Sequence, residues 1–96
     1  MIASFSSQGL KDFYLNGSKR GIQAKHADKL SRMLDQLNGA VQIRDLLFPG
    51  SGLHKKHPRE ADDHKQVWAM KVSGNWRLQF LFYDGNTHQV DYLDYH

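Results

Sequence analysis

The segment VWAMKVSGNWRLQFLFYDGNTHQVDYLDY, residues 67–95, carries the pattern that decides the fold. It contains three runs of β-branched, aromatic and other apolar residues, each long enough for a strand. Two tight-turn sequences separate them, Ser73-Gly74-Asn75 and Asp84-Gly85-Asn86, and an Asp-Gly pair is a strong hairpin signal. The segment therefore predicts two successive hairpins, which form an antiparallel meander. The predicted strands are 67–72, 76–83 and 88–95.

Upstream of this segment the apolar residues follow a helical period. An apolar stripe with helical spacing predicts a helix that ends at Asn38-Gly39. The stripe consists of Ala27, Leu30, Met33, Leu34 and Leu37. Ser7 has the position and chemistry of the N-cap of an earlier helix, which Asn16-Gly17 ends. That earlier helix carries Leu10, Phe13 and Tyr14 on one side.

Shorter elements surround the two helices. Ile2–Phe5 is consistent with a short first strand, and Val41–Phe48 with a further helical turn. The residues of this turn that we expect to face inward are Ile43, Leu46 and Leu47. Pro49-Gly50-Ser51-Gly52 ends the turn, and the polar stretch 53–66 predicts an exposed loop or a ragged strand.

The order of these elements predicts the α+β class. We expect a single domain over residues 1–96, with the helices packed on one face of a small antiparallel sheet. The chain has no cysteine, which excludes a disulfide framework and a thiolate metal site. It has no secretion signal and no apolar run of about 20 residues. A soluble, cytoplasmic protein without a membrane partner is therefore expected.

Positive charge is concentrated in two segments of this chain, whose net charge is +3. Residues 19–32 hold five basic residues and one acid, and residues 53–77 hold six basic residues and three acids. From Leu78 to the end there is no lysine or arginine. Such segments suit a polyanion such as nucleic acid, but a solvated helix face also carries lysines. Charge alone leaves both interpretations open.

The six histidines raise the question of a metal site. His54 and His57 lie three residues apart, and His88 and His96 lie at the two ends of the last predicted strand, with Asp91 and Asp94 nearby. None of the usual zinc spacings, such as HExxH, is present. The serines lack the glycine pattern of a nucleophile elbow, and no glycine-rich phosphate loop precedes a helix. We therefore expect neither a metal site nor a cofactor.

Metal-free cleavage of RNA is the chemistry that remains. The RNA 2′-hydroxyl is itself the nucleophile, so the protein supplies a base, a cation for the charge on phosphorus and an acid for the leaving oxygen. Arg77 is the candidate cation. Asp94 or a loop histidine is the candidate base, and His96 or a loop histidine is the candidate acid. Tyr95 is suited to stacking on or orienting a nucleobase.

The predicted hairpin brings these residues to one end of the sheet. Arg77 begins the second predicted strand and Asp94 to His96 end the third, so they lie side by side. Because side chains alternate along a strand, Arg77, Asp94 and His96 share one face if the register allows it. The competing interpretation makes Arg77 a surface residue that pairs with Asp94 or Asp91.

The remaining aromatic and imidazole side chains have simpler interpretations. Trp68, Trp76 and Tyr92 are expected to anchor the core rather than stack on nucleobases. His26 and His64 are expected to be surface residues.

Three motifs stand out when the chain is compared with known families. They are Pro49-Gly50-x-x-Leu53-His54, Asn75-Trp76-Arg77-Leu78-x-Phe80 and the C-terminal Asp94-Tyr95-His96. Taken together they resemble HigB toxins of the RelE/ParE superfamily, and the last two are specific in combination. The similarity spans essentially the whole chain, including the opening Met1-Ile2-x-Ser4-Phe5.

The resemblance implies a RelE-like fold and the toxin of a type II toxin–antitoxin pair. Such toxins enter the ribosomal A site and cut mRNA without metal, by attack of the 2′-hydroxyl on the adjacent phosphate. The implied partners are the ribosome, its mRNA and a cognate antitoxin, which is HigA-like and binds DNA through a helix-turn-helix.

The resemblance also assigns residues to roles. Arg77 matches the arginine that stabilises the transition state, and Asp94, Tyr95 and His96 match the catalytic and mRNA-contacting residues. The loop histidine of the family matches His54, or His57 if the alignment is made on His-Pro. The residues then expected to contact RNA are Lys55, Lys56, Arg59 and Trp76.

Two other functions are compatible with a fold of this kind. One is a ParE-like poison of DNA gyrase, and the other is a non-catalytic module that binds RNA or the ribosome. A nuclease requires the base, the cation and the acid together, whereas neither alternative does.

Overall fold

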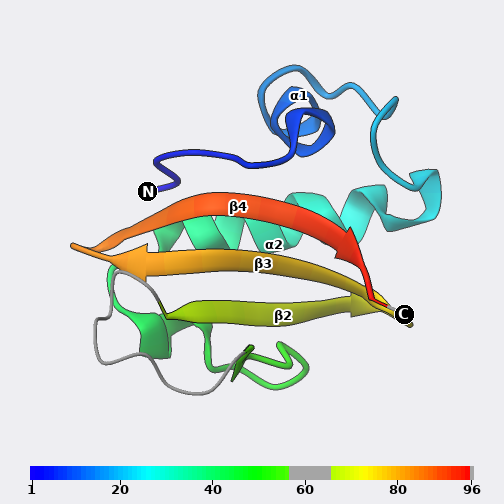
Figure 1. The fold of residues 1–96 in the computed structure, drawn as a ribbon. Helices are drawn as coiled ribbons and strands as arrows, with labels where there is room; N and C mark the ends of the chain where they lie inside the picture. Colours follow the sequence, from blue (N-terminus) through cyan, green and yellow to red (C-terminus); the bar gives the residue numbers. More distant parts are fainter. Residues whose placement is uncertain (57–65, 96) are drawn as a thin grey trace.

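The structure, a computed structural model, describes residues 1–56 and 66–95 of the chain. Within these residues it contains two α-helices, two 3-10 turns and a four-stranded antiparallel sheet (Figure 1). The predicted α+β class is confirmed. The predictions made for His57, Arg59, His64 and His96 lie outside the described residues. No helix in the described part of the chain is long and apolar enough to cross a membrane.

Helix α1, Gln8–Asn16, begins and ends where the sequence predicts. The hydroxyl of Ser7 accepts a hydrogen bond from the N–H of Leu10 at 3.2 Å, so Ser7 caps a helix end whose first N–H groups have no partner within the helix. Gly17 ends the helix with φ +76°, a left-handed conformation that favours glycine. Leu10 is fully buried and joins α1 to the core.

Helix α2, Ala27–Gly39, follows the 3-10 turn η1, Ala24–His26, and buries the predicted apolar stripe. The prediction that His26 is a surface residue was wrong, because its side chain is only 4% exposed. His26 lies one helical turn before Leu30, so it continues the buried stripe toward the N-terminus. The helical spacing of His26 relative to Leu30 indicated that it is buried, but its polar side chain favoured a surface position.

The helical turn predicted within Val41–Phe48 is the 3-10 turn η2, Ile43–Leu46. Leu46 is fully buried and Ile43 is half-buried, as predicted. The inward orientation predicted for Leu47 was wrong, because that side chain is 66% exposed. A 3-10 turn of four residues buries one side only, and Leu47 comes after its last residue.

The sheet contains β1 (His54–Lys55), β2 (Val67–Ser73), β3 (Trp76–Tyr83) and β4 (Asn86–Asp94), in that order. Every neighbouring pair is antiparallel, so the predicted meander is confirmed. The N-terminal segment runs beside β4 in parallel, with bridges from Ile2 to Thr87 and from Phe5 to Val90. Helix α2 lies behind the sheet in Figure 1, and α1 lies beyond the β4 edge.

The two faces of the sheet differ in what covers them. We call the face that α2 covers the helix face, and the opposite one the outer face. The helix face supplies buried core residues from all three long strands. They are Met70, Val72, Leu78, Phe80, Val90 and Tyr92. Trp68 and Trp76 pack against this core, which confirms that they anchor it.

The β3–β4 hairpin closes through a two-residue turn. Asp84 and Gly85 have φ values of 54° and 74°, and two left-handed residues in succession define a type I′ turn, which matches the twist of a hairpin. This turn pairs Tyr83 with Asn86 and so fixes the register at the start of β4.

A β-bulge then shifts that register by one residue. Gln89 has a φ of 53° and is the extra residue on β4. Its N–H donates to the hydroxyl of Ser4 at 2.9 Å, so the amide is bonded to the N-terminal segment. The pairs on either side of the bulge are Leu81 with His88 and Gln79 with Asp91. Beyond Gln89 the side chains of β4 have therefore exchanged faces.

Candidate active site

The register of the four strands places several of the candidate residues on the outer face. Residues that are paired across antiparallel strands project to the same side of a sheet. One row across the four strands consists of His54, Ala69, Gln79 and Asp91. The next row consists of Lys71, Arg77 and Leu93. The outer face of this row therefore carries two cations side by side.

Arg77 is held by the turn that precedes it. Its Nη1 donates to the carbonyl of Gly74 at 2.6 Å and to that of Trp76 at 3.0 Å. A guanidinium has five N–H donors in a planar fork, and these bonds use only one of its three nitrogens. Among the described residues, the other two nitrogens of Arg77 have no hydrogen-bond partner. The side chain is therefore oriented and still able to bind an oxyanion.

Tyr95 lies on the same face and is fixed at both ends. Its backbone N–H donates to the carbonyl of Asn75 at 2.8 Å, and its hydroxyl donates to Oε1 of Gln79 at 2.6 Å. Two cations lie close to its ring. Nζ of Lys56 is 3.4 Å from the ring centroid, and Cζ of Arg77 is 5.7 Å from it. Cations are attracted to the negative face of an aromatic ring, so the Tyr95 ring holds the Lys56 and Arg77 side chains close together on the outer face.

His54 projects from the exposed edge strand onto this face. Its Nδ1 lies 2.8 Å from the carbonyl oxygen of Gly52, which can only accept a hydrogen bond. Nδ1 therefore carries the proton, and a neutral His54 has its lone pair on Nε2. An imidazole with this tautomer is able to accept a proton from a ligand on the outer face.

Asp94 does not share a face with Arg77, so the expected arrangement was wrong on this point. Asp94 pairs with Trp76, whereas Arg77 pairs with Leu93. The Trp76 ring lies on the helix face, where it stacks on Tyr92 with 4.4 Å between ring centroids. Asp94 is therefore on the helix face of the strand end. The bulge at Gln89 is the cause, because it changes which residues of β4 face outward.

The predicted RNA contacts also separate by face. Lys56 lies on the outer face with Tyr95, but Lys55 pairs with Trp68 and places its Nζ 5.5 Å from that ring. Trp76 packs against the core on the helix face, so the outer-face cluster does not include it. We define this cluster as His54, Lys56, Arg77, Gln79 and Tyr95. Arg59, His57 and His96 lie outside the described residues.

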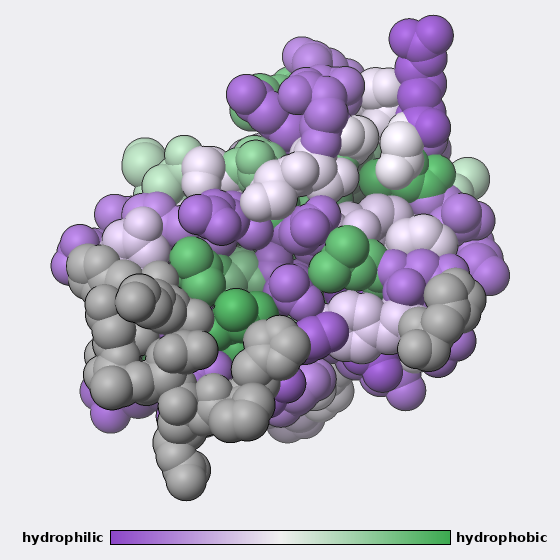
Figure 2. Space-filling model, in the orientation of Figure 1, coloured by the Kyte–Doolittle hydropathy of each residue, from purple (hydrophilic) through white to green (hydrophobic). Residues whose placement is uncertain are grey.

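Beside this cluster the outer face is hollowed. A cavity of about 180 Å³ lies next to Gln79, the hydrogen-bond partner of Tyr95. Its lining includes Val67, Leu81, Gln89 and Asp91. Figure 2, which looks onto this face, shows mostly hydrophilic residues with isolated hydrophobic ones. Gln79 was not among the residues predicted from the sequence, and its place next to Tyr95 depends on the register alone.

A buried polar pair supports the strand end from the helix face. Nδ1 of His26 lies 2.6 Å from the hydroxyl of Tyr92, and the N–H of Gln23 donates to the same hydroxyl at 3.4 Å. Burial raises the pKa of Tyr92, and nearby Asp94 raises it further, so the phenol keeps its proton. Burial, together with Lys25 and Lys29, lowers the pKa of His26. A neutral His26 therefore accepts the proton of Tyr92 at Nδ1.

The outer-face cluster combines the groups that a phosphate ester would meet. Arg77 and Lys56 bring positive charge, and His54 brings an imidazole whose Nδ1 is bonded to the Gly52 carbonyl. Phosphate oxygens are bound well by a guanidinium fork and by ammonium groups. The arrangement is therefore suited to binding a phosphodiester and to moving a proton beside it.

Comparison with known proteins gives two matches that cover the chain. Residues 3–96 match the family model described as "RelE-like toxin of type II toxin-antitoxin system HigB". The chain is also 32% identical over 96 residues to the "Endoribonuclease HigB" of Proteus vulgaris, and the alignment covers 100% of both chains.

Proposed function

Because this chain belongs to the HigB-like toxins of type II toxin–antitoxin systems, we propose that it is an endoribonuclease that cuts mRNA on the ribosome without a metal ion. Its relative in Proteus vulgaris carries the name of an endoribonuclease. The observation that carries the proposal is the outer-face cluster, in which an oriented arginine lies beside Tyr95 and one row from His54.

Arg77 is the proposed cation. The two guanidinium nitrogens that have no partner in the described part of the chain would bind non-bridging oxygens of the scissile phosphate, where charge increases as the 2′-oxygen attacks. Because the Gly74 and Trp76 carbonyls already orient the group, little reorganisation is needed during the reaction. Tyr95 would orient the neighbouring nucleobase against its ring, and Lys56 would neutralise an adjacent phosphate.

His54 is the proposed general base among the described residues. It lies on β1 and Arg77 on β3, two strand spacings apart and one row along, so about 12 Å separates their backbones. Two long side chains that converge from this separation leave room for a phosphate between them. The Nδ1–H bond to Gly52 holds the imidazole so that Nε2 is available.

The reaction balances without a co-reactant. His54 Nε2 takes the proton of the 2′-hydroxyl, the 2′-oxygen forms a bond to phosphorus, and the bond from phosphorus to the 5′-oxygen breaks. The 5′-oxygen takes a proton from a general acid, for which His57 and His96 are the candidates. The products are a 2′,3′-cyclic phosphate and a 5′-hydroxyl.

The partners follow from the same proposal. The basic outer face would meet mRNA in the ribosomal A site, which places the protein in the cytoplasm. A cognate antitoxin of the HigA-like kind, with a helix-turn-helix that binds DNA, would hold the toxin inactive. The family match supports a toxin–antitoxin pair.

Single-turnover cleavage of mRNA on programmed ribosomes tests the proposal. Arg77→Ala should lower the cleavage rate by roughly 10²–10³, the usual effect of removing a donor that stabilises an oxyanion. His54→Ala should lower it by roughly 10²–10⁴ if His54 is the base. Asp94→Ala, on the other face, should have a smaller effect than either. Exposed Lys11 on α1 provides the control Lys11→Ala, which should cleave at the wild-type rate.

Two results would overturn the proposal. One is a folded Arg77→Ala variant that cleaves at the wild-type rate. The other is undiminished cleavage of an mRNA that carries a 2′-deoxy nucleotide on the 5′ side of the cut, since the proposed nucleophile is then missing. Growth arrest with broken DNA and intact mRNA would instead indicate a gyrase poison, and ribosome binding without cleavage would indicate a binding module.

A further inference from the structure

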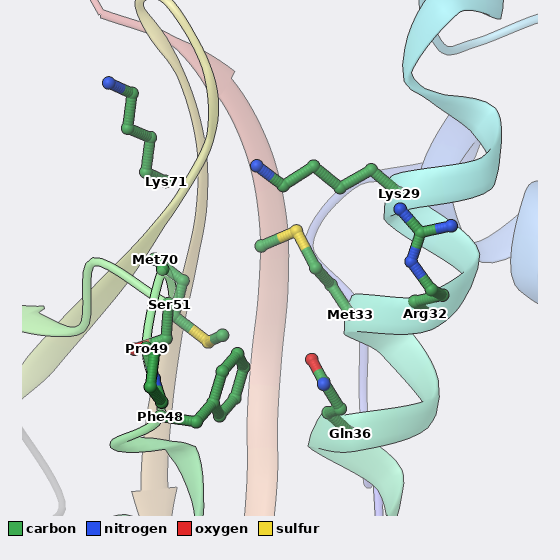
Figure 3. A pocket seen from close by; sticks show the side chains of 10 residues that line it. Lys29, Arg32, Met33, Gln36, Phe48, Pro49, Ser51, Met70 and Lys71 are labelled. Atoms are coloured by element: carbon green, nitrogen blue, oxygen red, sulfur yellow. The ribbon is translucent and has the colours of Figure 1, made fainter.

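A second hollow lies on the helix side of the molecule, away from the outer-face cluster. It has a volume of about 180 Å³ and separates α2 from the loop that follows η2. Figure 3 shows Met33 from α2, Met70 from β2 and the ring of Phe48 around this space. Met33 and Met70 are buried core residues, so the floor of the hollow is apolar and rigidly supported. We call it the α2 groove.

The rim of the α2 groove is positively charged. Lys29 and Arg32 supply this charge from the helix side, and none of the residues that line the groove is acidic. Lys71 also lines the groove, but its side chain belongs to the outer face beside Arg77 and points away from the groove in Figure 3. Within residues 1–56 and 66–95, neither the Lys29 nor the Arg32 side chain has a hydrogen-bond or ion-pair partner. In Figure 3 the Lys29 side chain extends from α2 toward the sheet. The rim is therefore prepared for an anionic partner.

The size and chemistry of the groove decide what kind of partner fits. Pockets for small molecules usually measure about 300–1,000 Å³, so a space of about 180 Å³ is too small for most of them. A phosphate chain would use the cations but not the floor of methionine and phenylalanine. One apolar side chain fits the floor, and protein interfaces are commonly anchored by such a side chain in a pocket. Carboxylates beside that anchor would meet Lys29 and Arg32.

We propose that the α2 groove is a docking site for the antitoxin, which inserts one apolar side chain and surrounds it with acidic residues. This inference rests on the proposed toxin function, because that function requires an antitoxin. Charge complementarity supports this proposal. A basic rim beside an apolar floor favours an acidic segment that has an apolar anchor, and it disfavours a segment that is purely apolar. The docked segment lies on the side of the sheet opposite His54 and Tyr95.

The test measures antitoxin binding by isothermal titration calorimetry. The antitoxin is identified as the protein whose co-expression relieves the growth arrest, and all toxins carry Arg77→Ala so that they can be produced. Arg32→Glu and Lys29→Glu should each weaken binding at least tenfold, and raised salt should weaken the parent complex. Arg44 is an exposed residue on η2 outside the groove, so Arg44→Glu is the matched control, with affinity within twofold of the parent.

Hydrogen exchange provides the second measurement and locates the contact directly. The antitoxin should protect amides of residues 29–36 and 48–51, the two segments that contain most of the lining residues of the α2 groove. Equal affinity of the groove variants and the parent, or protection confined to the outer face, would refute the groove. Groove variants that keep the antitoxin but lose binding to vacant ribosomes would also refute it and indicate an RNA contact. If the parent binds no antitoxin at all, the toxin function itself fails.

Discussion

The hydrogen bond between Tyr92 and His26 makes a sharp prediction about stability. Tyr92→Phe removes one oxygen atom and keeps the ring that stacks on Trp76 at 4.4 Å. Without the hydroxyl, Nδ1 of His26 loses its partner at 2.6 Å in a side chain that is 4% exposed. Nε2 of His26 already lacks a partner among the described residues. The variant therefore leaves an imidazole with neither ring nitrogen bonded.

The magnitude follows from the cost of an unsatisfied buried group. Leaving a buried donor or acceptor without a partner costs about 1–3 kcal/mol. In a domain of this size each kcal/mol corresponds to about 4–8 °C in Tm, so Tm should fall by roughly 5–20 °C. Urea unfolding followed by circular dichroism, with thermal unfolding in parallel, gives both quantities. The urea m-value should not change, because the variant keeps the compact native state.

A matched variant separates the hydroxyl effect from the general effect of a tyrosine change. Tyr14 is half-buried and packs its ring 5.7 Å from that of Phe5, and its hydroxyl has no hydrogen-bond partner among the described residues. Tyr14→Phe should therefore change the free energy of unfolding by less than about 0.5 kcal/mol. If Tyr92→Phe proves as stable as Tyr14→Phe, the hydrogen bond between Tyr92 and His26 does not stabilise the end of the strand.

Three further predictions concern the same fold. The pKa of His26 is lowered in the folded chain, so below the ordinary pKa of about 6.5 the unfolded chain binds more protons than the folded one. The free energy of unfolding should therefore fall as the pH drops from 7 toward 5. His26→Gln should make this pH dependence smaller, as measured by urea unfolding at each pH. Leu46→Ala should lower the free energy of unfolding by about 2–5 kcal/mol, whereas Leu47→Ala should change it by less than about 0.5 kcal/mol; equal losses would contradict the structure. A Cβ added at Gly21 would overlap the backbone of α1, so Gly21→Ala should lower Tm, while Gly39→Ala, which meets no atom within 4 Å, should not.

The sequence predicts the elements of this fold because local rules determine them. The Ser7 cap, the Asn16-Gly17 stop and the Asp84-Gly85 turn each depend on a few neighbouring residues. The apolar stripe of α2 is equally local, since helical spacing alone identifies it. Predictions of this kind were confirmed because no distant contact opposes them.

The orientation of the site residues depends on contacts that local rules do not describe. Arg77 and Asp94 lie almost symmetrically about the turn in the sequence, but the pairing is Arg77 with Leu93. His26 was assigned to the surface because its partner, Tyr92, is 66 residues away. A polar side chain can be buried when a distant residue satisfies it, and the sequence around it gives no sign of that residue.

The bulge at Gln89 has a consequence for comparing this chain with its relatives. Side chains of a regular β-strand alternate between the two faces of the sheet, so the face of a residue follows from its distance along the strand. The extra residue Gln89 reverses the faces that this rule would give to the residues after it. A relative whose last strand has the same residues but pairs without a bulge would turn its equivalent of Asp94 outward and its equivalent of Tyr95 inward, although the two C-terminal sequences are the same. Roles at the C-terminus should therefore be transferred by counting from the bulge. Deleting Gln89 would remove the extra residue and leave the residues after it on their present faces, with Tyr95 outward and Asp94 on the helix face.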